Sequence, residues 1–106
     1  MKANTTPPII STRNIGRNRG KARIWIEGND LANKGWQKGA SFYCRFQDGR
    51  IVYERHTEGN RRVAGTMARP IIDTNTDNII DSLGADCEVV RIEFTADSIT
   101  IEPAKA

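Results

Sequence analysis

The sequence predicts one mainly β domain with two short helices, built from two copies of a strand–helix–hairpin unit. Three observations favour this fold class. The chain has 106 residues, enough for one ordinary domain and too few for two. Its apolar residues alternate with polar ones over short segments, which is typical of half-buried strands. The order strand, short helix, glycine, strand, turn and strand occurs twice along the chain.

The first unit, repeat 1, spans about residues 22–58 and contains a strand, one helical turn and a hairpin. These elements are expected, in chain order, at 23–27, 31–34, 41–47 and 50–55. Gly35 can end the helical turn in a left-handed conformation. Asp48-Gly49 is a strong signal for a tight turn between the two hairpin strands.

The second unit, repeat 2, spans about residues 66–102 and has the same order of elements. They are expected at 70–73, 78–83, 87–94 and 99–102. Apolar hairpin positions of the two repeats lie 48 residues apart, whereas Gly35 and Gly84 lie 49 apart, so one deletion accounts for the change. Agreement of so many elements in order favours an internal duplication.

The unit resembles the swapped-hairpin module of the SpoVT-AbrB family, which includes AbrB-type regulators and MazE-type antitoxins. The resemblance covers about residues 22–102. It is carried by Gly35-Trp36-Gln37-Lys38-Gly39 and the hairpin after it, and by Leu83-Gly84-Ala85-Asp86 and the second hairpin. It implies a pseudo-two-fold swapped-hairpin or cradle-loop β-barrel, which the family builds from two chains. A double-psi barrel uses the same elements.

Two units in one chain would close such a barrel internally, because each would cover the apolar face and strand edges of the other. A monomer is then sufficient, and a homodimer remains open. We expect residues 22–106 to form this single duplicated barrel. Residues 1–21 are expected to be a flexible basic arm, although over residues 11–22 propensity does not decide between a flexible arm and a loop-rich strand.

Charge is distributed unevenly along the chain. Residues 1–69 hold 14 Lys and Arg against 5 Asp and Glu, a net charge of +9. Residues 70–106 hold 2 against 8, a net charge of −6. The first part is therefore predicted to bind a polyanion, through positive charge gathered on one lobe.

Two basic clusters are candidate nucleic-acid contacts, since Lys and Arg release counterions when they neutralise phosphates. The first belongs to the arm and the first strand, and the second to the linker between the repeats. The candidates are Arg13, Arg17, Arg19, Lys21, Arg23, Arg61, Arg62 and Arg69. The family resemblance implies that Arg23, with Lys21, faces DNA. Residues 13–28 also resemble, more weakly, segments that accompany phage-type DNA cytosine methyltransferases.

The sequence lacks the motifs of an enzyme, and we expect no catalytic activity. We also expect no cofactor and no bound metal. The only histidine, His56, lies in a polar turn and is expected to be solvated. Cys44 and Cys87 lack metal-ligand spacing and are expected to be small buried residues. The family resemblance implies that Trp36 lies in the core, where large aromatic side chains are common. A long apolar segment is lacking, which favours a soluble, cytoplasmic protein without a membrane partner.

Two functions fit these features. The first is a small DNA-binding accessory or transcriptional regulator that uses the basic first half. The second is a protein-interaction module that uses the acidic second half, such as an antitoxin or an anti-CRISPR-like phage inhibitor of a nucleic-acid-handling partner.

Overall fold

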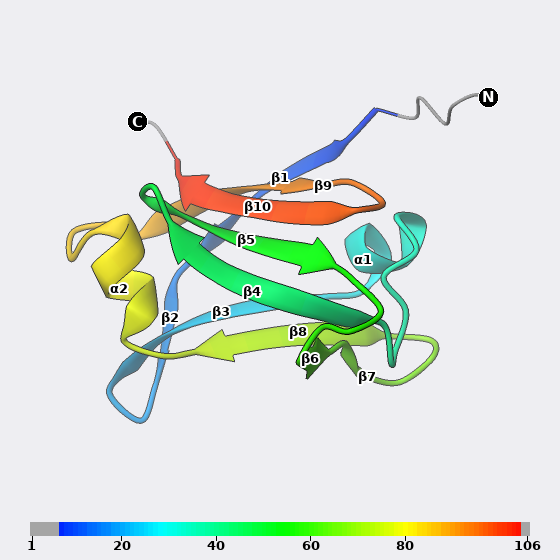
Figure 1. Cartoon of the computed structure of the whole chain (residues 1–106). Coiled ribbons are helices and arrows are strands. Elements are labelled where there is room, and N and C mark those ends of the chain that lie inside the picture. The colour runs from blue at the N-terminus through cyan, green and yellow to red at the C-terminus, as the bar shows by residue number, and fades with distance from the viewer. Residues whose placement is uncertain (1–6, 105–106) are drawn as a thin grey trace.

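Residues 7–104, which the computed structural model describes, fold into ten strands and two short helices (Figure 1). The helices are α1 (Asn29–Asn33) and α2 (Asn78–Leu83). The strands, in chain order, are β1 (Ile9–Asn14), β2 (Gly16–Asn18), β3 (Lys21–Glu27), β4 (Ser41–Gln47), β5 (Arg50–Arg55), β6 (Arg61–Arg62), β7 (Ala64–Gly65), β8 (Pro70–Asn75), β9 (Val89–Phe94) and β10 (Ser98–Pro103). The mainly β class and the two short helices are confirmed. No helix between residues 7 and 104 has the length and apolar character needed to cross a membrane.

The strands form two antiparallel sheets that do not close into a barrel, so the predicted closed barrel is wrong. One sheet has the order β1-β9-β10-β5-β4-β6 and the other β2-β3-β8-β7. The chain passes from the first sheet to the second at Ile15 and again at Val63. The amide of Ile15 bonds to the Glu88 carbonyl, and that of Val63 to the Ala40 carbonyl, both at 2.9 Å. At each crossing a strand of one sheet ends and a strand of the other begins. Both sheets keep strand edges that are not paired with another strand.

The pairing register relates the two halves of the chain by a constant shift of 48 residues. Trp25 lies opposite Asp73 on β3 and β8, and Val52 lies opposite Thr100 on β5 and β10; both pairs are 48 apart. The β1–β9 and β2–β3 pairings recur, with the same register and shift, as the β6–β4 and β7–β8 pairings. We call residues related by this shift counterparts. The two halves are interleaved, because the first strand of each pairs with the hairpin of the other.

The prediction of a flexible arm is wrong for residues 9–18. Residues 9–18 form β1 and β2, and β1 pairs with β9 along its whole length. Ile9 packs against the core, which gives this segment an apolar reason to stay folded. Arg19 and Gly20 have φ angles of 57° and 79°, so they form a two-residue turn between β2 and β3. Residues 1–6 of the expected arm lie outside the described residues.

The core lies between the inner faces of the two sheets and beneath both helices. The β3 positions alternate between buried and outward-facing, with Ala22, Ile24 and Ile26 buried. Trp36 is fully buried, as predicted, and its indole N–H donates to the Thr95 carbonyl at 2.8 Å. It thereby joins the loop after α1 to the β9–β10 turn.

One polar pair crosses the apolar core. The Tyr53 hydroxyl on β5 hydrogen-bonds to the Thr74 hydroxyl on β8, so the bond joins the two sheets. Both residues are buried, and burial raises the pKa of Tyr53 above its usual range, partly offset by the bond to Thr74. Their counterparts are Ile101 and Ile26, which are buried and apolar. The fold therefore tolerates either an apolar or a polar set at these positions.

Tyr53→Phe should lower the free energy of unfolding by about 1–3 kcal/mol, because it leaves the Thr74 hydroxyl buried without its partner. Adding Thr74→Val should recover most of the loss, since an apolar pair of similar shape needs no hydrogen bond. Urea denaturation of the three proteins measures both effects. A double variant less stable than Tyr53→Phe alone would contradict this role of the pair.

Candidate nucleic-acid interface

Three of the eight predicted cations are already ion-paired. Arg13 lies 3.3 Å from Asp30, and Arg69 lies 3.8 Å from Glu27. Arg23 donates two hydrogen bonds to Asp73, at 2.9 and 3.0 Å, which raise the pKa of the guanidinium. Its guanidinium also lies 4.5 Å from the centre of the Trp25 ring. These contacts leave less of the charge of these three residues available to a phosphate.

The other five cations have no ion-pair partner among residues 7–104. Arg17, Arg19 and Lys21, here called the hairpin cations, lie on β2, its turn and the start of β3. All three are exposed. Arg61 and Arg62, here called the β6 cations, are exposed on β6, where Arg62 donates to the Ser41 hydroxyl at 3.0 Å.

The two sets lie at opposite ends of the molecule and do not form one patch. Figure 1 shows the β2–β3 turn at the end that carries α2, and β6 at the end that carries α1. The seven residues of β3 run between these ends, a span of about 20 Å at the usual rise of a strand. Arg69 lies at the α1 end with the β6 cations, because it follows β7 and contacts Glu27.

The prediction that positive charge gathers on one lobe is also wrong. The basic half and the acidic half of the sequence interleave, so β3 with Arg23 lies against β8 with Asp73. What remains is a difference between the ends of the molecule. Both ends carry Arg and Lys side chains that lack an ion-pair partner among residues 7–104, but at the α2 end four acidic residues, on α2 and directly before and after it, lack such a partner as well. These acids are Asp77, Asp81, Asp86 and Glu88.

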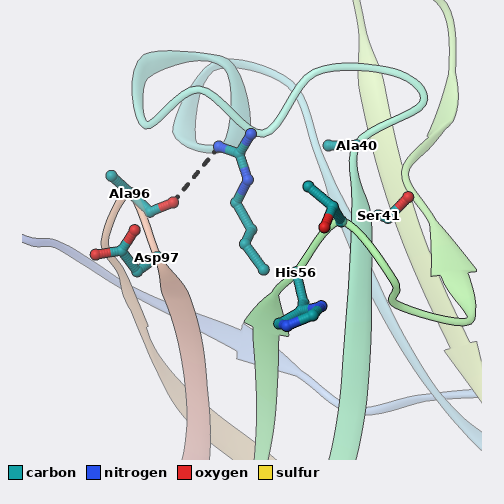
Figure 2. Close-up of a pocket in the computed structure, with 7 residues that line it drawn as sticks. Ala40, Ser41, His56, Ala96 and Asp97 are labelled. Carbon is teal, nitrogen blue, oxygen red and sulfur yellow. Dashed lines mark hydrogen bonds between the residues drawn. The ribbon is translucent and has the colours of Figure 1, made fainter.

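A hollow of about 620 Å³ opens at the α1 end. It is lined by residues at the start of β4, the end of β5 and the β9–β10 turn. These are Ala40, Ser41, Arg55, His56, Thr57, Ala96 and Asp97. Figure 2 shows Ala96 and Asp97 on one side, Ala40 and Ser41 on the other, and His56 below. Sequence reasoning missed Arg55 as a site residue, because a lone arginine at a strand end carries no local signal.

His56 is exposed, as predicted. Its Nδ1 atom accepts a hydrogen bond from the Glu58 amide at 3.0 Å, and its ring lies 5.4 Å from the Tyr43 ring. Ser41, His56 and Asp97 are the residue types of a hydrolytic triad, yet within residues 7–104 no side-chain hydrogen bond joins them. In the same part of the chain, no three His, Cys, Asp or Glu residues form a group that could hold a metal ion.

The two cysteines are free thiols that pack against the core while remaining partly exposed. Burial raises the pKa of the Cys44 thiol, and the charge of Arg61 partly offsets this. Burial also raises the pKa of Cys87. Both thiols are therefore mostly protonated near neutral pH, which suits the predicted packing role better than a reactive one.

Gly59 holds the β5–β6 linker against β4 and so positions the β6 cations. A Cβ atom at this position would lie 2.4 Å from the backbone nitrogen of Phe42, which no side chain can accept. The Gly59 amide bonds to the His56 carbonyl at 2.9 Å, which tightens the same turn.

Comparisons with protein-family models, with curated proteins and with solved structures gave no match to this chain.

Gly59→Ala should destabilise the fold by about 1–3 kcal/mol, because the linker must move away from β4. Gly16→Ala is the matched control, since its Cβ would lie at an ordinary 3.7 Å from the Arg23 carbonyl. Urea denaturation should give a lower midpoint for Gly59→Ala only. Equal midpoints for the two variants would show that the linker does not depend on this close approach.

Proposed function

We propose that the protein binds duplex DNA through its β2–β3 hairpin, as a small non-enzymatic accessory or transcriptional regulator. The observation that carries the proposal is the set of hairpin cations, Arg17, Arg19 and Lys21, which lack an acidic partner among residues 7–104. They project from a two-stranded ribbon, and the major groove of B-DNA is wide enough to admit such a ribbon. Asn18 on the same ribbon is half-buried, and its side-chain amide donates to Asn75 Oδ1 at 3.1 Å, which ties the ribbon to β8.

The pseudo-symmetric pairing supports the further proposal that the chain is an internally duplicated swapped-hairpin protein. A constant shift of 48 residues across both sheets is hard to explain unless the halves share an origin. The proposal implies that one chain supplies what two chains supply in the SpoVT-AbrB family. A monomer would then present the complete DNA-binding surface.

The two ends are not equivalent as DNA contacts. The counterparts of Arg17, Arg19 and Lys21 are Gly65, Met67 and Arg69 on the β7–β8 hairpin. Because only Arg69 is charged, and it already contacts Glu27, the β7–β8 hairpin is a poor phosphate contact. The β6 cations add positive charge at that end, about 20 Å from the hairpin cations. With the hairpin cations as the strong contact and the β6 cations as the weaker one, we expect modest, salt-dependent affinity for duplex DNA.

A protein partner is the second candidate function. The observation that favours it is the group of unpaired acids at α2, which would complement a basic partner surface. These acids lie beside the hairpin cations, since Arg17 and Glu88 line one depression. A basic partner bound at α2 would therefore compete with DNA at the hairpin.

Changing Arg17, Arg19 and Lys21 together to Ala should weaken binding to random duplex DNA at about 50 mM salt by about tenfold or more. The slope of log affinity against log salt should also become shallower, by up to about 3, because up to three phosphate contacts are lost. Gel-shift titrations at about 50 and about 200 mM salt measure both quantities.

The matched control is Arg45→Ala with Arg50→Ala and Arg91→Ala, which removes the same charge from the outer face of the six-stranded sheet. It should bind DNA more tightly than the hairpin variant does. Equal loss in both triple variants would mean that net charge, and not the hairpin, carries binding. No binding by the unmodified protein at about 50 mM salt would exclude the proposed function.

A further inference from the structure

The hollow at the α1 end is built by three segments that are far apart in the sequence. They are the start of β4, the residues just after β5 and the β9–β10 turn, and the backbone fixes them together. The Arg55 amide bonds to the Asp97 carbonyl at 2.9 Å, and the His56 amide bonds to the Ser41 carbonyl at 3.1 Å. The volume of about 620 Å³ lies within the usual range for sites that bind small molecules.

Arg55 is held in a fixed orientation beside this hollow. Its Nη1 atom donates to the Gly35 carbonyl at 2.9 Å and to the Ala96 carbonyl at 3.4 Å, the second bond being drawn in Figure 2. Its guanidinium lies 5.5 Å from the centre of the buried Trp36 ring. Nε and Nη2 have no hydrogen-bond partner among residues 7–104, and no acidic side chain there pairs with the charge. The group therefore offers free donors without the entropy cost of being ordered.

Neutral donors surround the same space. Because Nδ1 of His56 accepts a bond from the Glu58 amide, the neutral ring carries its proton on Nε2 and can donate from there. The Ser41 hydroxyl accepts from Arg62, which leaves its own hydrogen free to donate. Thr57 adds a second hydroxyl to the lining. A guanidinium with several N–H and O–H donors is the environment that a phosphate group prefers.

The opposite end of the molecule shows that the fold does not require these residues. The counterparts of Arg55 and His56 are Pro103 and Ala104, and the counterpart of Asp97 is Gly49. The counterpart of Ser41 is Val89. These positions have the same pairing register at both ends of the molecule, yet only the end with the hollow carries the charged and hydroxylated set.

We propose that this hollow binds the phosphate of a phosphorylated, hydroxyl-bearing ligand of about nucleotide size. Arg55, with His56, Ser41 and Thr57, contacts the phosphate, and Asp97 accepts a hydrogen bond from a ligand hydroxyl. The Asp97 carboxylate repels any anion, and a ligand hydroxyl that donates to it offsets this repulsion, which inorganic phosphate without a sugar does not do. The phosphate belongs either to a free sugar phosphate or to the 5′ end of a nucleic acid. The site is independent of the hairpin cations proposed to bind duplex DNA.

The test is an amide NMR titration of the full chain with ribose 5-phosphate, with ribose and with inorganic phosphate. Ribose 5-phosphate at about 10 mM or below should shift the amides of Ser41, Thr57 and Asp97, whereas ribose should not. Inorganic phosphate should bind more weakly than ribose 5-phosphate. No shift at these amides with any of the phosphorylated probes, including the oligonucleotide below, would overturn the proposal.

Arg55→Gln should weaken binding about tenfold or more, and Arg45→Gln, on the outer face of the six-stranded sheet, should leave it unchanged. If Arg55→Gln unfolds, because its bonds to Gly35 and Ala96 are also lost, His56→Ala tests the same site. Binding that stays the same in every variant of the hollow would contradict the assignment.

The source of the phosphate is distinguished by a short single-stranded oligonucleotide with and without a 5′ phosphate. Shifts in the hollow that need the 5′ phosphate, with none from ribose 5-phosphate, identify a nucleic-acid end as the ligand. The triple hairpin variant should keep these shifts, so failure of the duplex-binding proposal and failure of this one can be separated.

Discussion

The antiparallel pairing of β3 with β8 is the constraint on which the rest of the structure depends. Apart from these two strands, the four-stranded sheet contains only β2 and β7, with three and two residues. Backbone bonds continue the pairing at both ends, from the Gly28 amide to Pro70 and from the Thr76 amide to Ala22. Because one strand comes from each half, neither half has a sheet to cover its hairpin without the other. This shared sheet contributes one side of the core, α1 packs against both of its long strands, and α2 contacts β3 as well as β4 and β5.

The same pairing determines where charge is available for binding. Interleaving sets the basic β3 beside the acidic β8, and Arg23 is neutralised by Asp73 at the centre of the sheet. Among residues 7–104, cations without an ion-pair partner include those of the β2–β3 hairpin, those of β6, and Arg55 at the end of β5. The two proposed binding surfaces therefore lie at opposite ends of the molecule. The ends differ because the duplicated fold carries different side chains on each, as Arg55 and its counterpart Pro103 illustrate.

Local patterns were enough to predict most elements. The predicted strands at 41–47 and 50–55 and the helix at 78–83 agree with β4, β5 and α2, since alternation, Asp48-Gly49 and Gly84 are strong short-range signals. The β2–β3 hairpin was missed because Arg19-Gly20 is a weak turn signal and cations mask the alternation of its strands. The ion pairs of Arg13 and Arg23 were unpredictable from one sequence, because their partners lie 17 and 50 residues away. Whether the sheets close into a barrel also depends on tertiary packing, which periodicity does not encode.

The most direct measurement is the set of backbone NOEs between β3 and β8 in a sample that mixes isotope-labelled and unlabelled chains. Interleaving within one chain predicts contacts centred on Trp25 and Asp73, and a second set on β5 and β10 centred on Val52 and Thr100, all of them intramolecular. Pairing of β3 with a different strand, or NOEs at these positions that arise between two chains, would contradict it.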